Sequence, residues 1–234
     1  MSHNPGRQLA LSIKLPDHAK FDNYVGDRRV VDYLRSQLQR LSGSSRFIYI
    51  WGDRASGRTH LLQASCREAN QLGYASVYLP MSERQRLEPA VLTDLSRRDL
   101  VCFDDVEAVA GQHGWEEALF HFLNEAKDSN TRVLMSGRCA PAELPVSLAD
   151  LKSRLTAALV LRIEALSDSE KKAAIVLRAK NRGIELSEEV AAFILTRASR
   201  DTTTLFGLLD ELDRENVHQQ RRITIPFVKE VLRL

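Results

Sequence analysis

Residues 51–60, Trp-Gly-Asp-Arg-Ala-Ser-Gly-Arg-Thr-His, form a glycine-rich stretch with the spacing Gly52-x-x-x-x-Gly57-Arg58-Thr59. Two glycines at this spacing let the backbone wrap around a diphosphate, and a hydroxyl at the position of Thr59 can ligate Mg²⁺. An apolar, strand-like run at 46–51 precedes the stretch, and a helix-like run at 60–66 follows it. The sequence therefore predicts a phosphate-binding loop between a strand and a helix. The alternative is an ordinary glycine turn before a helix.

Arg58 stands where this type of loop usually carries lysine. Its guanidinium is permanently charged and has five donors, so it can hold phosphate oxygens at least as firmly as lysine. The planar fork is wider than an ammonium group, however, and cannot place a point charge between the last two phosphates in the same way. The substitution favours nucleotide binding over efficient hydrolysis by this chain.

The composition predicts a cytoplasmic protein with one α/β domain and a small appendage. The chain has 234 residues and a formal net charge of +2, from 33 Lys and Arg against 31 Asp and Glu. This balance gives little electrostatic reason for strong direct binding to nucleic acid. No stretch approaches a membrane span, the N-terminus lacks a secretion signal, and the three cysteines lack metal-ligand spacing. We therefore expect protein partners and no membrane association.

Five apolar runs separated by helical patterns predict an α/β fold, with a parallel sheet covered by helices on both faces. The predicted strands lie at 46–51, 75–79, 100–103, 132–135 and 158–163. Helices are expected from Asp22 to the break at 42–45, after the glycine loop, and at 115–127.

The pattern becomes all-helical after Leu166, which predicts a second, smaller domain. Ser167 is typical of a helix N-cap and Gly183 of a helix end, and further helices are expected to begin near 187, 202 and 226. We expect a flexible arm at 1–15, a nucleotide-binding α/β domain at 16–165 and a helical lid at 166–234.

Polar residues end two of the predicted strands and should meet at the carboxyl edge of the sheet, where ligands of such sheets bind. Asp104 can hold the water shell of Mg²⁺, and Asp105 can orient a nucleophilic water. Ser136 follows the fourth strand, where its hydroxyl can sense a terminal phosphate. For each residue a plain turn-forming role is the alternative.

The order of these motifs resembles the AAA+ domain of the bacterial initiator DnaA. The resemblance rests on the loop with its continuation through Leu62, the run at 103–111, the Ser153-Arg154-Leu155 segment and the helical lid, and it spans nearly everything after about Phe21. DnaA continues past the lid into a DNA-binding domain, whereas this chain ends there. Its length and its Gln-Leu-x-Leu arm are similar to the family of regulatory inactivators of DnaA, which work with the DNA-loaded sliding clamp.

The resemblance implies roles for residues far from the glycine loop. Gln8, Leu9 and Leu11 match the peptide that docks on the DNA polymerase III sliding clamp, a role suited to an extended arm with one amide and two apolar anchors. Arg154 matches the catalytic arginine that is presented in trans to ATP bound by DnaA. Taken alone, Arg154 would be interpreted as a solvated helix arginine.

The resemblance also implies that Tyr24 and Val25 pack on the nucleobase, with a hydrophobic staple of the first helix as the alternative. The expected nucleotide site is Tyr24, Val25, Gly52, Ala55, Ser56, Gly57, Arg58, Thr59, His60 and Ser136, with Mg²⁺ at Thr59 and Asp104. One departure concerns the lid, where Thr203 occupies the position of a phosphate-sensing arginine and Arg200 is the nearest basic residue. This departure, like Arg58, favours a bound diphosphate such as ADP.

The resemblance thus predicts a regulator that holds ADP or another nucleoside diphosphate with Mg²⁺, docks on the clamp and stimulates hydrolysis of DnaA-bound ATP. Such a protein lowers replication initiation and contacts DNA indirectly, through the clamp. One alternative is an autonomous ATPase in which Asp104 and Asp105 act catalytically on the chain's own ATP. Another is a scaffold that uses the fold only for protein contacts. A homodimer or a larger homo-oligomer is compatible with these functions.

Gln8→Ala should selectively weaken the complex with the sliding clamp, because it removes the amide anchor of the arm. Isothermal calorimetry of the variant and the unaltered chain against the clamp measures this loss. Unchanged affinity would reject the arm as the docking element.

Overall fold

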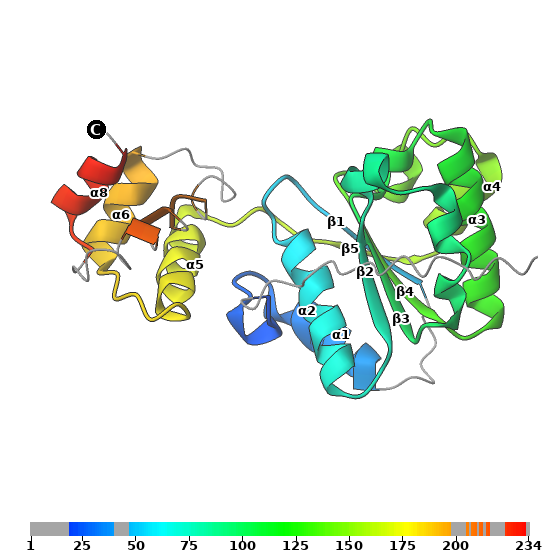
Figure 1. Cartoon of the computed structure of the whole chain (residues 1–234), viewed down its shortest axis with the longest axis horizontal. Helices are drawn as coiled ribbons and strands as arrows, with labels where there is room; N and C mark the ends of the chain where they lie inside the picture. The colour runs from blue at the N-terminus through cyan, green and yellow to red at the C-terminus, as the bar shows by residue number, and fades with distance from the viewer. Residues whose placement is uncertain are drawn as a thin grey trace, which may run out of the picture.

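The computed structural model of the chain describes residues 19–39, 47–197 and 223–232, and between the last two ranges residues 205, 207–209, 211–212 and 214–215. These residues form an α/β domain followed by a group of helices (Figure 1). Within this described part, no helix is long and apolar enough to cross a bilayer.

Five parallel strands form the centre of the α/β domain. They are β1 (Phe47–Trp51), β2 (Ser76–Pro80), β3 (Leu100–Asp104), β4 (Arg132–Gly137) and β5 (Leu159–Arg162), in the order β2-β3-β4-β1-β5. The register pairs Trp51 with Gly137 and Pro80 with Asp104, so the strands end together at one edge. The predicted parallel sheet is thus confirmed, and its carboxyl edge carries both the glycine loop and Asp104.

Helices cover both faces of this sheet. The α-helices are α1 (Arg28–Gln39), α2 (Arg58–Gln71), α3 (His113–Asp128) and α4 (Ala149–Thr156), and the 3-10 helices after β2 are Met81–Arg86, Pro89–Leu92, Leu95–Arg97, Val106–Val109 and Pro141–Glu143. Helices α1 and α2 lie on one face, and α3 and α4 lie on the other (Figure 1). Along β1, Ile48 and Ile50 pack with α1 and α2, whereas Tyr49 packs with α3 and α4. This double burial explains the nearly continuous apolar runs of the central strands.

The last strand is less buried than its apolar sequence predicts. Leu159 and Val160 are 37% and 39% exposed. Among the described residues, β5 is an edge strand that pairs with β1 and has no neighbouring strand on its outer side. The expectation of a strand covered on both faces was wrong here, because apolar composition does not distinguish an edge strand from a central one.

The helix predicted to start at Asp22 is interrupted. Residues Phe21–Asn23 form a single 3-10 turn, α1 begins at Arg28, and Gly26 between them has a φ angle of 141°. Residues with a side chain rarely adopt this conformation, so the glycine permits a sharp change of chain direction. The break leaves Tyr24 outside the helix and free to pack over the glycine loop.

The helices after Leu166 form a core of their own. They are α5 (Asp168–Lys180), α6 (Glu188–Arg197) and α8 (Ile225–Leu232), and most of the helix predicted at 202–218 lies outside the described residues. The predicted cap of α5 is present as a capping box, in which Ser167 and Glu170 each accept a hydrogen bond from the other's backbone amide. Apolar side chains from all three helices form a cluster separate from the two clusters beside the sheet.

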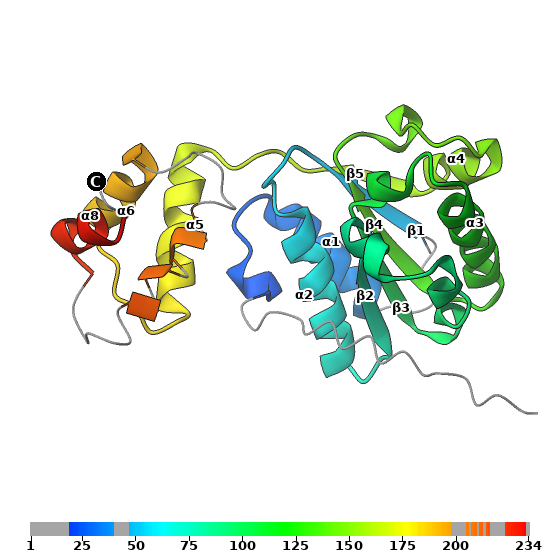
Figure 2. The same ribbon diagram turned by 45° about the horizontal axis from the view of Figure 1, so that its top comes forward.

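This helical domain lies on the side of the sheet that carries α1 and α2. In both views α5 is near the 3-10 turn Phe21–Asn23, whereas α3 and α4 are at the opposite end of the molecule (Figures 1 and 2). The nucleotide loop lies between these two ends, at the start of α2. A ligand in the loop would therefore be within reach of the lid, while the α3 and α4 side faces away from it.

Candidate functional site

The loop between β1 and α2 has the backbone shape of a phosphate site. Ala55 and Gly57 have φ angles of 63° and 98°, so the chain passes twice through left-handed conformations before α2 begins. Gly57 is the N-cap residue of α2, and no side chain caps the first amides of the helix. These free amides and the positive end of the helix dipole favour an anion at the loop.

Asp104 lies at the centre of the site and is almost fully buried, with 3% exposure. Its Oδ2 accepts hydrogen bonds from Thr59 Oγ1 and from the Tyr78 hydroxyl, each at 2.7 Å, and its Oδ1 accepts one from Ser136 Oγ. The structure thus brings together Thr59 and Asp104, the two residues expected at Mg²⁺. Sequence reasoning missed Tyr78, whose only signal is a hydroxyl in an otherwise apolar strand.

Ser136 supports the two aspartates and is completely buried. In addition to its bond to Asp104, its Oγ accepts a hydrogen bond from the Asp105 amide at 3.0 Å. Asp105 itself has a φ angle of 55°, an unusual conformation for a residue with a side chain. Ser136 therefore holds the backbone at the end of β3 in this structure, and its role as a phosphate sensor stays a prediction.

Arg58 does not extend into the open loop. Its side chain is 7% exposed, with Nη2 at 3.3 Å from Asp105 Oδ1 and Nη1 at 3.8 Å from Glu107 Oε1, and Arg138 Nε lies 3.2 Å from the same Glu107 oxygen. Burial and the charge of Asp104 raise the pKa of Asp105, and the charge of Arg58 opposes this shift. Burial likewise raises the pKa of Glu107. The guanidinium is thus an internal counter-ion for two carboxylates, of which Glu107 was not expected from the sequence.

One buried hydroxyl of the loop fits a phosphate group. Ser56 Oγ has no hydrogen-bond partner within the described ranges. Buried donors are normally paired, so an oxygen-rich ligand would complete it. No group of three or more His, Cys, Asp or Glu in the described residues could hold a metal ion. Mg²⁺ would therefore depend on phosphate oxygens and waters, with Thr59 and Asp104 as the protein's contribution.

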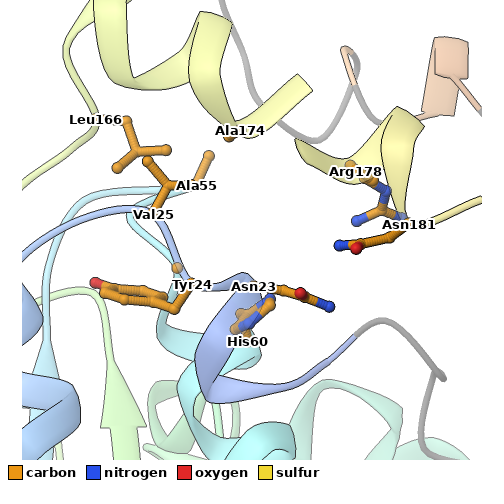
Figure 3. A pocket seen from close by; sticks show the side chains of 10 residues that line it. Asn23, Tyr24, Val25, Ala55, His60, Leu166, Ala174, Arg178 and Asn181 are labelled. Carbon is orange, nitrogen blue, oxygen red and sulfur yellow. The ribbon is translucent and has the colours of Figure 1, made fainter. Parts of the chain in front are cut away.

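A pocket lies between the loop and the lid. It is lined by Asn23, Tyr24, Val25, Ala55, Gly57, His60, Leu166, Ala174, Arg178 and Asn181. Figure 3 shows Tyr24, Asn23 and His60 on one side. On the other side it shows Ala174 and Arg178 of α5 and Asn181, the residue that follows this helix. Five of the ten residues expected to bind nucleotide line this pocket. The lid residues were missed, because only tertiary folding brings α5 to the loop.

The rings of His60 and Tyr24, which line the pocket on the side of the loop, are uncharged and pack against each other. His60 Nε2 lies 2.8 Å from the Lys20 carbonyl oxygen, and its ring is tilted against Tyr24 with centroids 5.8 Å apart. Burial lowers the pKa of His60, and the charge of Arg178 lowers it further. Burial raises the pKa of Tyr24 to about 12. The aromatic face of a nucleobase could therefore pack here against the uncharged rings of Tyr24 and His60.

Arg154 is distant from this pocket. It lies in the last turn of α4, whose Leu151 and Leu155 are fully buried, and its own side chain is half-buried. Within the part of the chain that the structure describes, its guanidinium has no hydrogen bond or ion pair. The structure does not bring Arg154 to the chain's own loop.

Several residues predicted from the sequence lie outside the described residues. They are Gln8, Leu9 and Leu11 of the arm, and Arg200 and Thr203 of the lid. Their expected roles stay predictions.

A parallel sheet with a phosphate loop, a carboxylate at the end of a neighbouring strand and a helical lid define the AAA+ class of nucleotide-binding proteins. The bacterial DnaA ATPase domain matches residues 19–162, and the Hda lid domain matches residues 168–232. The chain belongs to the DnaA-related AAA+ family, and its lid is of the Hda type. These matches identify a DnaA-related regulator of replication initiation.

Solved structures of replication and recombination proteins share this fold. Domain III of the Thermotoga maritima initiation protein DnaA is 22% identical with a TM-score of 0.77, over 94% of this chain and 97% of that chain. AMPPCP-bound DnaA from Aquifex aeolicus is 24% identical with a TM-score of 0.68, over 84% and 65%. The Thermotoga maritima RuvB branch migration motor is 18% identical with a TM-score of 0.65, over 94% and 72%.

Gly57→Ala should weaken binding of a nucleoside diphosphate by about tenfold or more, equivalent to about 1.4 kcal/mol. A Cβ atom at Gly57 would lie 2.8 Å from the Tyr24 ring, and the φ angle of 98° at this position disfavours any residue with a side chain. The substitution therefore strains the loop and also displaces Tyr24, which lines the pocket. Calorimetric titration with ADP and Mg²⁺ measures the loss.

Gly73→Ala provides the matched control for this experiment. Gly73 has a similar φ angle of 88°, but an added Cβ atom would meet nothing within 4 Å. Both variants should lose about 1 kcal/mol of stability from backbone strain, whereas only G57A should lose affinity. Equal affinity of the two variants would contradict the assigned position of the nucleotide.

Proposed function

We propose that this DnaA-related protein binds a nucleoside diphosphate with Mg²⁺, docks on the DNA polymerase III sliding clamp and stimulates hydrolysis of ATP bound to DnaA. It would act in the cytoplasm and lower replication initiation. The matches to the DnaA ATPase domain and the Hda lid domain support the class of regulator. The structures of DnaA bound to AMPPCP support a nucleotide as the ligand of this chain.

The geometry of the loop supports binding more than turnover. Ser56 Oγ and the first amides of α2 are donors for phosphate oxygens, and Thr59 with Asp104 would contribute to an Mg²⁺ site. When bound, Mg²⁺ would neutralise part of the phosphate charge. A hydrolytic site also needs a carboxylate free to orient water. Asp105 is instead paired with Arg58, and its amide is bonded to Ser136.

The position of Arg154 is the observation that carries the proposal. The arginine has no internal partner among the described residues and belongs to the last turn of α4. Helix α4 lies with α3 on the face of the sheet opposite the lid (Figure 1). An arginine in this position cannot serve the nucleotide between the chain's own loop and lid. It is accessible to a second protein, where a guanidinium can stabilise charge that develops during phosphoryl transfer.

Arg154→Ala should leave folding, clamp binding and nucleotide binding intact and lower the stimulated ATPase rate of DnaA by roughly 10³-fold, the usual contribution of an arginine supplied in trans. The assay measures phosphate release from ATP-loaded DnaA in the presence of clamp on DNA. Lys152→Ala, which removes a positive charge from the same helix, is the matched control and should retain stimulation. Retained stimulation by R154A would refute the assigned role.

Denaturing the purified chain should release a nucleoside diphosphate, because the site binds two phosphates without completing a hydrolytic centre. Chromatography of the released nucleotide against di- and triphosphate standards makes the measurement.

Two other results would indicate a different function. Steady ATP turnover by the chain alone, if it is lost on Asp104→Asn, would establish an autonomous ATPase. Purified protein that neither retains nor rebinds nucleotide would indicate a scaffold.

A further inference from the structure

A buried carboxylate of α3 accepts hydrogen bonds from backbone amides at the N-terminal end of α4. Glu116 is 1% exposed. Its Oε1 accepts hydrogen bonds from the amides of Gly111 at 2.6 Å and Ser147 at 3.0 Å, and its Oε2 accepts from the amides of Ser147 at 3.0 Å and Leu148 at 2.7 Å. Leu148 is the N-cap residue of α4 and has no side chain that can cap the helix. Glu116 thus supplies a cap that the local sequence lacks.

Glu116 is stabilised in its charged form. Burial acts to raise its pKa, but the hydrogen bonds from the Ser147, Gly111 and Leu148 amides outweigh burial and lower the pKa below its usual value. A negative charge at a helix N-terminus also interacts favourably with the helix dipole. Since a buried carboxylate without partners is costly, the carboxylate and the three amides hold one another in defined positions.

One of these amides belongs to the segment that leaves the nucleotide site. Gly111 comes shortly after the 3-10 helix Val106–Val109, which starts directly after Asp105. Its φ angle of 75° places the chain in a left-handed turn toward α3. The Glu116 carboxylate therefore connects the segment after the site aspartates to a helix on the far face of the sheet.

The other two amides lead into the helix that carries Arg154. Helix α4 has only eight residues, so its start and its last turn are close together. Leu151 and Leu155 are buried against α3 and the sheet, which sets the rotation of the helix about its axis. With the start held by Glu116 and the rotation held by the leucines, the direction in which the Cα–Cβ bond of Arg154 leaves the helix is determined.

We propose that Glu116 is a positioning residue for Arg154. Glu116 joins the segment after Asp105 to the start of α4 and so holds the backbone that carries the arginine in one position for a partner's nucleotide. This inference rests on the proposed function of Arg154 and adds the residue that prepares it. Glu116 itself touches no nucleotide and acts only through the backbone of α4.

Glu116→Gln tests the proposal, because the amide keeps the shape of the side chain but replaces one acceptor oxygen with a donor that opposes a backbone amide. Glu117→Gln is the matched control, since Glu117 is adjacent and exposed, and its one ion pair within the described ranges is with His113. Glu116→Asp keeps the negative charge on a side chain that is shorter by one methylene group. It is measured alongside and supplies the comparison if E116Q does not fold. Stimulation of DnaA's ATPase is titrated with each variant, and diphosphate affinity is measured by calorimetry.

E116Q should lower the maximal stimulated rate by about ten- to a hundredfold, as expected when a catalytic group is misplaced by about 1 Å. The concentration of the variant that gives half-maximal stimulation, and its affinity for the diphosphate, should change less than about twofold, because the substitution leaves the docking arm and the loop unaltered. E116D should show the same selective loss, smaller in size. Hydrogen exchange should become faster at the Ser147 and Leu148 amides but not in the sheet.

A double variant distinguishes positioning from general stability. E116Q added to R154A should cause no further loss, because the arginine that Glu116 positions is already absent. A further loss, or a parallel loss of diphosphate affinity in E116Q, would overturn the proposal in favour of a purely structural role. Full stimulation by E116Q with loss in R154A would overturn this inference alone, whereas full stimulation by R154A would overturn the proposed function as well.

Discussion

The carboxylate of Asp104 is the interaction on which the site depends, because it joins four elements of the fold. It ends β3 and accepts hydrogen bonds from Thr59 of α2, Tyr78 of β2 and Ser136 of β4. A carboxylate with 3% exposure is costly unless its oxygens are satisfied, and three hydroxyls satisfy them here. The same bonds place the start of α2, and with it the glycine loop, against the carboxyl edge of the sheet.

The sheet divides the molecule into two functional sides. On one side, the lid and the loop enclose a pocket with Tyr24, His60 and Arg178 among its walls. On the other side, α4 carries Arg154, and the buried Glu116 binds the amides at the start of that helix. This arrangement suits a protein that holds one nucleotide for itself and offers an arginine to another.

The sequence predicted the elements that are formed by interactions between residues close together along the chain. The glycine spacing predicted a tightly wrapped phosphate-binding loop, and Ser167 predicted the N-cap of α5, because in each case the interacting atoms are a few residues apart. The apolar runs predicted a parallel sheet, since strands covered on both faces have that composition. The exposed edge strand β5 and the break at Gly26 were not predicted. The exposure of β5 depends on what lies beside the strand in space, whereas the break at Gly26 has a local cause, the positive φ angle of the glycine, which the helical pattern of the flanking residues obscured.

The sequence by itself determined the class of protein, the phosphate loop and the pair of aspartates, because these follow from backbone conformation and from periodicity over short stretches. Only the tertiary structure decided what each charged group faces. Arg58 pairs with Asp105 and Glu107, Arg178 reaches the pocket from the lid, and Glu116 caps a helix 32 residues away from it in sequence. A buried charge must find its partner wherever folding brings one within reach, and that choice is made by packing between distant segments.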